Sequence, residues 1–493
     1  MPAIYGRMAV SPRDWHLPAL LVLFIAARLC AWAAGVAPPT QHPDHWQFQN
    51  PQILHDDLVA GLWYLHSQPP LWNLIYGLSL KFFDSAVLLY ATAIASNLLS
   101  TMLIYRLITR LSGACGVAFV AAAIFAVMPA ALLYENFPLP TSFVAAMVLL
   151  ATWCATELNG PQRSAAFLGF VLAMWALTMS RATFHIAMVP LACALACLPW
   201  RGAWMRRFLP LLVASVSLPL MVYVKNWVLF DTFAASSWGP MNAARMVTVD
   251  VPRPALLDAV QRGKCDSIVE AGAFAWTETY RPYVKDDAKF IAVSQRLESA
   301  RSYLRDYNSL EILTAANRFS KAVPCIIAAS PGIYLENVRR AVGIFLSASH
   351  HYIYLGSGED GPPAGGDNVE RLRPYIDMFD RVLWLPIGSG PLKSNAPSLV
   401  VVLVVAVWLT AWLFARGWMS WRTEEDALRS GAFVLGSLFF AVELATCLVE
   451  VLENNRFRHE VEPLMFVFAA VAVAMGARHL APLRPQPKAL KVM

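Results

Sequence analysis

The chain has 493 residues, of which 57% are hydrophobic and only 15% are charged. A soluble domain carries about 25% charged residues, so this composition excludes an ordinary soluble enzyme. The net charge of +6 gives no reason to expect a nucleic-acid partner, because the basic residues cluster at the ends of apolar segments, as in membrane proteins. The sequence therefore predicts an all-α polytopic membrane protein.

Apolar segments of about 20 residues, the length that crosses a bilayer, recur along the chain. Predicted spans lie near residues 17–37, 86–107, 115–134, 141–157, 164–181, 183–200, 207–231, 398–416, 431–450 and 461–479. The apolar segment 323–355 is interrupted by Pro324 and Pro331, which favours a re-entrant or interfacial hairpin over two full spans. These segments predict a bundle of about 10–12 transmembrane helices.

The basic residues orient the bundle, because Lys and Arg concentrate in the cytoplasmic loops. The loops assigned to the cytoplasm contain Arg7, Arg13, Arg106, Arg110, Arg163, Arg201, Arg206, Arg207, Arg416, Arg422 and Arg429. The opposite face then carries the first loop, 38–85, and the long region 241–397. This pattern divides the chain into an N-terminal transmembrane module (1–240), an external loop region (241–397), and a C-terminal module with a cytoplasmic tail (398–493).

Cysteine usage agrees with an oxidising space on the outer side. Eight cysteines are present, and most lie in or beside apolar segments, where a thiol acts as a small hydrophobic side chain. Cys265 and Cys325 both fall in the external region, so they are the pair expected to form a disulfide.

The first external loop concentrates titratable residues beside the membrane. Asp44, Asp56 and Asp57 are candidates for a general base, with Asp44 preferred because it follows the first span closely. Asp56 and Asp57 lie on a predicted short amphipathic helix, 53–65. Downstream, paired prolines predict a fixed backbone that directs His66 and Gln68, and His66 is expected to donate to a phosphate oxygen. The alternative is a solvated loop with interfacial aromatic residues, in which Asp56 caps a helix.

Further charged residues lie at the predicted outer ends of other spans. Glu135 follows the third span, Arg181 ends the fifth, and Lys225 lies near the end of the seventh. Arg456 and Arg458 precede the last span. A single basic residue at a helix end usually extends to the interface, but several helices presenting cations on one face indicate a site for an anion such as phosphate.

Five sequence runs carry a resemblance to a known superfamily. They are HSQPPLWNL, MPAALLYENFPLPTS, LTMSRAT, YVKNWVLFDTFAASSW and NNRFRHEVEP. In order and sidedness they resemble the GT-C integral membrane glycosyltransferases, and within these the bacterial relatives of the protein O-mannosyltransferase and aminoarabinose transferase families. The likeness covers roughly residues 15–240 and 398–480. The usual Asp-Glu pair of the first loop is absent, since His45 follows Asp44 here.

The resemblance implies an inverting glycosyltransferase that takes a sugar from a polyprenyl-phosphate donor. It implies catalytic roles for Asp44, Asp57 and His66, phosphate binding by Arg456, Arg458, Lys225, Arg181 and Gln68, and supporting roles for Asp56 and Glu135. No cofactor is expected, a divalent metal is neither required nor excluded, and the acceptor is a glycan, lipid or protein. The expected location is a bacterial inner membrane with the site facing outward. Competing interpretations are a transporter or flippase for a lipid-linked saccharide, and a polysaccharide polymerase or ligase.

Overall fold

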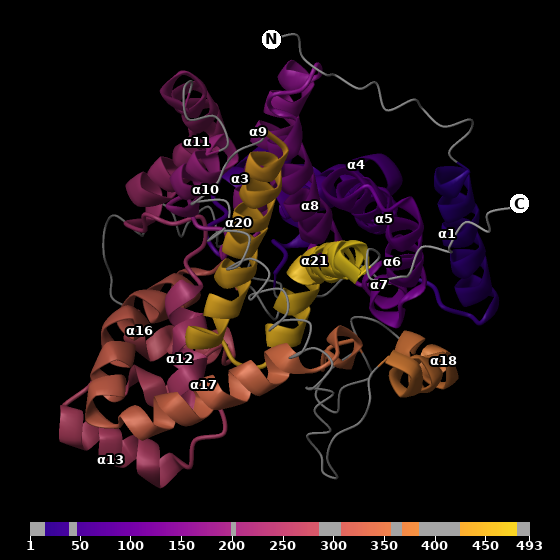
Figure 1. Ribbon diagram of the computed structural model, residues 1–493. Coiled ribbons are helices and arrows are strands. Elements are labelled where there is room, and N and C mark those ends of the chain that lie inside the picture. The colour runs from indigo at the N-terminus through magenta and orange to yellow at the C-terminus, as the bar shows by residue number, and fades with distance from the viewer. Residues whose placement is uncertain are drawn as a thin grey trace, which may run out of the picture.

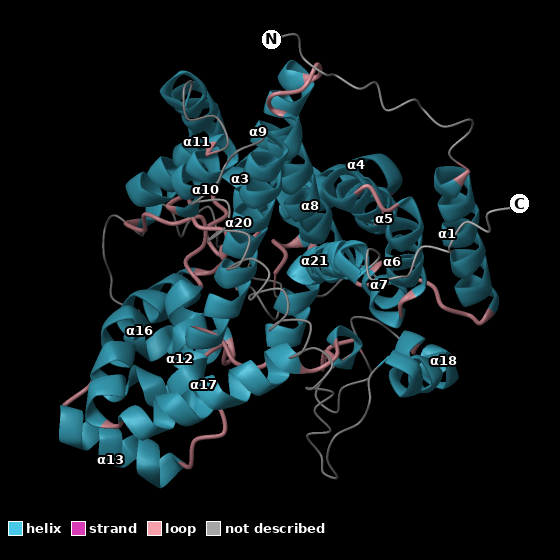
Figure 2. Cartoon of the chain, in the orientation of Figure 1, coloured by secondary structure: helices cyan, strands magenta, loops and turns pink. Residues whose placement is uncertain are grey.

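The computed structural model describes residues 15–38, 47–198, 204–284, 307–355, 367–383 and 424–480. Throughout these ranges the regular secondary structure is helical, as Figure 2 shows. Six described helices are long and apolar enough to cross a membrane. They are α1 (His16–Ala33), α5 (Val87–Ser112), α9 (Arg163–Ser180), α11 (Trp204–Phe230), α20 (Glu424–Ala445) and α21 (Asn454–Leu480). The chain is therefore a multi-pass membrane protein with an all-α fold.

Three shorter apolar helices complete the bundle: α6 (Cys115–Val127), α8 (Thr141–Glu157) and α10 (Met188–Cys197). Most predicted spans coincide with one of these helices, and the predicted span 398–416 lies outside the described residues. The prediction of one continuous helix over 115–134 was wrong. Met128 is extended because it precedes Pro129, so the segment breaks into α6 and the short helix α7 (Pro129–Tyr134).

The centre of the bundle is formed by α5, α8, α9 and α21, with α8 packed against the other three. Small residues allow the helices to approach closely, as is usual in membranes, where packing rather than hydrophobic burial drives helix association. Gly169 on α9 illustrates the contact, because an added Cβ would lie 2.7 Å from the Cys154 sulfur on α8. By contrast, α1 and α11 present most of their apolar surface outward.

The first external loop folds into short helices that lead into the bundle. The predicted amphipathic helix at 53–65 is two helices, α2 (Pro51–Asp56) and α3 (Leu58–Trp63), because Asp57 leaves the helical conformation and caps α3. The paired prolines then begin α4 (Pro70–Phe83), with Pro70 in the first helical position that proline favours.

A second helical unit lies at one end of the molecule, on the side away from the start of α1 (Figure 1). It contains α12 (Gly239–Thr248), α13 (Arg253–Gly263), η2 (Ser267–Ala271), α14 (Thr277–Tyr280), η3 (Arg281–Tyr283) and α16 (Leu310–Ala329). Its buried core includes Met241, Ile268 and Phe319. The expected disulfide between Cys265 and Cys325 is confirmed and joins the end of α13 to α16.

The interrupted apolar segment 323–355 contributes the end of α16, then α17 (Pro331–Leu346) and the turn η5 (Ser349–His351). Neither α16 nor α17 is among the helices apolar enough to span a membrane. The two helices pack on each other, and α17 also packs against α21. Near this end of the molecule, α18 (Asn368–Leu383) packs against α7. Through the contacts of α17 with α16 and α21, the second helical unit is attached to the bundle at the N-terminal end of α21.

Candidate functional site

A cavity of about 290 Å³ lies where the second helical unit meets the bundle. Its charged lining residues are Arg181, Arg245, Glu450, Glu453 and Arg456. They come from the C-terminal end of α9, from α12, and from the connection between α20 and the start of α21. The distribution of Arg and Lys among the loops predicts that all these segments face outward. The fold thus gathers arginines and glutamates that are distant in sequence at one cavity, which the loop charges predict to lie on the outer face.

Arg456 projects from the first turn of α21 and is only 1% exposed. Its Nη2 donates to Glu453, while its Nε and Nη1 have no hydrogen-bond partner among the described residues. The guanidinium carbon lies 5.5 Å from the ring centroid of Tyr352 and 5.1 Å from that of Phe457. A buried cation with unused donors is costly, so this geometry favours an anion in the cavity.

Arg181 approaches the same cavity from the end of α9. Its Nε lies 3.0 Å from Oε1 of Glu460, whose side chain is fully buried. Its guanidinium carbon lies 4.6 Å from the ring centroid of Phe457. Nη2 of Arg181 is buried and has no hydrogen-bond partner in the described part of the chain. Arg181 and Arg456 thus both contact Phe457 and both retain donors that suit a phosphate oxygen.

A third arginine belongs to a carboxylate network on the cavity wall. Nη1 of Arg245 lies 2.9 Å from Oε1 of Glu450 and 3.3 Å from Oε1 of Glu453. Burial raises the pKa of Glu450 to about 7, an effect that the nearby Arg245 opposes only in part. Oε2 of Glu450 has no hydrogen-bond partner among the described residues. A carboxyl with a pKa near neutrality is suited to accept a proton from a substrate.

Arg458 lies behind the cavity and does not line it. Its Nη2 donates to Ser349 Oγ at 2.6 Å, and its Nη2 also lies 3.3 Å from Oε1 of Glu462. Ser349 in turn donates to Oε2 of Glu462 at 2.8 Å, and Nδ1 of His459 lies 2.7 Å from the same oxygen. This buried network fixes the first turns of α21 against η5, so Arg458 serves the framework of the site.

Of the polar residues expected near the donor phosphate, Gln68 lines the cavity and His66 does not. His66 is buried, and burial lowers its pKa to about 3, so its ring is neutral. Its Nε2 donates to the carbonyl oxygen of Asn308 at 3.0 Å, which leaves Nδ1 to accept from Ser237 at 2.9 Å. Both ring nitrogens are therefore engaged within the protein.

The contacts of His66 explain how Gln68 is positioned. Oδ1 of Asn308 accepts hydrogen bonds from the backbone N–H groups of His66 and Ser67, at 2.9 and 3.1 Å. Nζ of Lys225 donates to the carbonyl oxygen of Leu65 at 2.7 Å, so Lys225 also holds this turn and does not line the cavity. The second helical unit and α11 together fix the backbone on which Gln68 reaches the cavity.

Of the carboxylates proposed from the first loop, the two that the structure describes, Asp56 and Asp57, do not line the cavity. Asp56 is exposed and pairs with His55 at 2.8 Å, while the side chain of Asp57 accepts from the backbone N–H of Ala60 at 3.0 Å. Asp44 lies outside the described residues. Gln47, three positions after Asp44, is a lining residue of the cavity. The described residues that follow Asp44 in the first loop therefore begin at the cavity wall.

Glu135 is buried inside the bundle, where its carboxylate accepts hydrogen bonds from side chains of two other helices. Its carboxylate accepts from Nε of Arg28 at 3.0 and 3.1 Å and from Nδ2 of Asn97 at 2.9 Å. Burial raises its pKa, and the Arg28 cation opposes this shift. Glu135 is not among the lining residues, so its contacts indicate a role in holding α1 and α5 together around α7.

Arg245 and Glu450 line the cavity but were not predicted from the sequence as site residues. Arg245 falls within a long polar region without a clear motif, and Glu450 follows an apolar run as an isolated acid. One available signal was the density of charge immediately after Glu450, in the run ENNRFRHEVEP. Their pairing depends on α12 folding against the start of α21, which no local pattern reveals.

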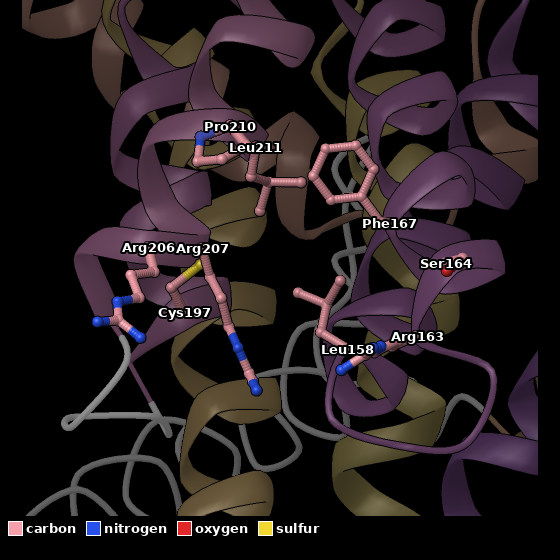
Figure 3. A pocket seen from close by; sticks show the side chains of 9 residues that line it. All are labelled: Leu158, Arg163, Ser164, Phe167, Cys197, Arg206, Arg207, Pro210 and Leu211. Carbon is pink, nitrogen blue, oxygen red and sulfur yellow. The ribbon is translucent and has the colours of Figure 1, made fainter.

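A second cavity, of about 350 Å³, lies at the opposite end of the bundle. Figure 3 shows Arg206 and Arg207 on one helix. They face Arg163 and Phe167 across this cavity. Arg163 begins α9 and Arg181 follows its end, so the two cavities are separated by about 27 Å, the length of an 18-residue helix. The lining of this cavity contains no carboxylate, so it lacks the acid–base groups of the external cavity.

Comparison with known proteins does not assign the chain to a family. No family model matches the chain, and no curated protein sequence matches it. Among solved structures, a crystal structure of ArnT from Cupriavidus metallidurans bound to undecaprenyl phosphate is similar over 95% of this chain and 81% of that chain. The sequence identity is 14% and the TM-score is 0.34. Values this low say nothing about the activity of the present chain.

Proposed function

We propose that the chain is a GT-C-type inverting glycosyltransferase with a polyprenyl-phosphate sugar donor, acting at the outer face of a bacterial inner membrane. The observation that carries this proposal is the pair of buried arginines, Arg181 and Arg456, which line one cavity and keep donors without a hydrogen-bond partner among the described residues. A monoanionic or dianionic phosphate would satisfy these donors, and its polyprenyl tail would remain in the bilayer.

The reaction requires stabilisation of the leaving group. The acceptor oxygen attacks the anomeric carbon, the bond from that carbon to the phosphate oxygen breaks, and the polyprenyl phosphate leaves with the electron pair. Negative charge grows on the phosphate during this step, and Arg181 and Arg456 would stabilise it without reorganising. Gln68, which also lines the cavity, would donate a further hydrogen bond. The apolar rings of Trp238 and Phe457 would limit the entry of water.

The acceptor proton needs a base, and two carboxylates qualify. Asp44 remains the first candidate because its loop continues directly to Gln47 on the cavity wall. Glu450 is the second, because it lines the cavity and its pKa is raised to about 7. Asp57 ranks behind both, since its side chain caps α3. Substitution of Glu450 should change how the transfer rate depends on pH if Glu450 is the base, and this separates the two leading candidates.

The test is a transfer assay with purified protein and polyprenyl-phosphate-linked sugars carrying a radiolabel on the sugar. A glycosyltransferase releases free polyprenyl phosphate, either with an acceptor or slowly by hydrolysis. A flippase leaves the sugar–phosphate bond intact and moves the intact donor across the bilayer of a liposome. Transbilayer movement without bond cleavage, across a panel of sugars, would overturn the proposal.

A further inference from the structure

Two histidines and an aspartate meet outside the cavity described above. His350 and His351 form the end of the turn η5, and Asp380 projects from α18. Nε2 of His350 lies 2.9 Å from Oδ1 of Asp380, and Nε2 of His351 lies 3.3 Å from Oδ2. One ligand atom from each residue falls within 4.8 Å of the other two. The group thus joins two elements that are distant in sequence.

The contact between His350 and Asp380 is a buried ion-pair contact of 2.9 Å between Nε2 and Oδ1. The imidazole of His350 is nearly fully buried, at 4% exposure. Nε2 of His350 and Oδ1 of Asp380 are both buried without a hydrogen-bond partner among the described residues. When Nε2 carries no proton, its lone pair and the carboxylate oxygen face each other in a buried place, and a bound cation would stabilise this arrangement.

We propose that His350, His351 and Asp380 bind a divalent transition-metal ion, with Zn²⁺ the best match. Imidazole nitrogen and carboxylate oxygen are common zinc ligands, bound at about 2.0–2.2 Å in a tetrahedral arrangement. Ligand atoms around such an ion lie roughly 3.4 Å apart. The separations of 2.9 and 3.3 Å observed here are near that value. His351 is 42% exposed, so water has access to a fourth position.

The position of this metal site suggests a structural role. Ser349 immediately precedes His350 and forms the hydrogen bonds that hold Arg458 and Glu462 at the start of α21. The ion would fasten α18 to η5 and so stabilise the framework behind the arginine cavity. Elsewhere α18 is held by Asn368, which exchanges hydrogen bonds with the backbone of Ala37 at 2.9 and 3.1 Å. The metal site does not depend on the proposed transferase activity.

The test uses the full-length protein, purified with a tag that lacks histidine and stripped of metal with a chelator. Zn²⁺ is titrated and bound metal is measured by elemental analysis, alongside the melting temperature. We expect one saturable Zn²⁺ per chain and a rise in melting temperature in the parent protein. Asp380→Asn and His350→Gln should weaken zinc binding by at least about tenfold. The matched control is Asp377→Asn, an exposed carboxylate one turn earlier on α18 that should leave zinc binding unchanged.

Two results would overturn the proposal. One is the absence of a saturable site in the parent, with variants that only lower the melting temperature, as expected for a metal-free His–Asp ion pair. The other is equal zinc content in the parent and Asp380→Asn. If the variants do not fold, Co²⁺ loaded into the parent decides the question. Saturable visible absorption bands of a tetrahedral site at one equivalent support it, and their absence refutes it.

Discussion

Arg181 and Glu460 form an ion pair in which Nε and Oε1 are 3.0 Å apart, although 279 residues separate them in the sequence. Their side chains are 8% and 0% exposed. The pair joins the C-terminal end of α9 to α21, and Nη2 of Arg181, a residue that lines the cavity, has no hydrogen-bond partner among the described residues. The geometry of the proposed donor site therefore depends on a carboxylate that does not line it.

The first prediction concerns this buried pair. Glu460→Gln removes the carboxylate that balances Arg181, and breaking a buried pair in this way typically costs about 3–5 kcal/mol. We expect a clearly lower melting temperature in detergent. Glu278→Gln is the control, because Glu278 is an exposed residue of α14 whose ion pair with Arg281 contributes little. Equal melting temperatures for the two variants would show that the Arg181–Glu460 pair does not stabilise the fold.

A second prediction tests the sidedness of the bundle. Arg253 on α13 is 69% exposed, and Met205 at the start of α11 is 60% exposed, so a cysteine at either position is accessible from its own side. With the exposed Cys30 and Cys115 replaced by serine, an impermeant thiol reagent should label Arg253→Cys in intact cells and spare Met205→Cys. Labelling of position 205 from outside would invert the assignment.

A third prediction follows from the pKa of Glu450. Burial raises this pKa to about 7, above its ordinary value, so the ionised form becomes populated only as the pH approaches neutrality. If Glu450 is the base, the transfer rate should rise about tenfold between pH 6 and pH 8, and Glu450→Gln should remove this rise. The same raised pKa means that the contribution of Glu450 to stability is lost as the pH increases from about 4.5 to 7. A variant with the parent's pH profile would eliminate Glu450 as the base.

The fourth prediction separates the aspartates of the first loop. Asp44→Asn keeps the shape of the side chain but cannot accept a proton, so a loss of about 10²–10⁴-fold in transfer rate is expected, with donor binding largely kept. Asp57→Asn is the matched control, because asparagine caps a helix as well as aspartate does. Parent-like rates for Asp44→Asn combined with an inactive Asp57→Asn would reverse the order of the two candidates.

The sequence predicted most of the bundle because apolar periodicity and length are local properties. The segment predicted at 141–157 is α8, and the paired prolines, which were predicted to fix the backbone, stand at the start of α4. The errors have local physical causes. Pro129 ends a helix that hydropathy alone continues, and Asp57 interrupts a helix by capping the next one.

The site was only partly predictable, because its groups are brought together by tertiary packing. Arg456 and Arg181 stood out as cations at the ends of spans, and both line the cavity. Arg458, two positions after Arg456, could not be distinguished from it by sequence, yet it binds Ser349 and Glu462 behind the cavity. Glu450 gave no sequence signal of its own, since its raised pKa arises from burial beside Arg245.

The most direct test of the account is the affinity of the purified protein for undecaprenyl phosphate in the parent and in Arg456→Gln. Removing one charge-assisted contact to a phosphate costs about 1.5–3 kcal/mol, so the Kd should rise about 10–150-fold. Glu453 keeps Arg245 as a partner in this variant, so the fold should survive. Arg253→Gln, which removes an exposed external cation, should bind as the parent does. Equal Kd values for the parent and Arg456→Gln would contradict the proposal that the arginine cavity binds the donor phosphate.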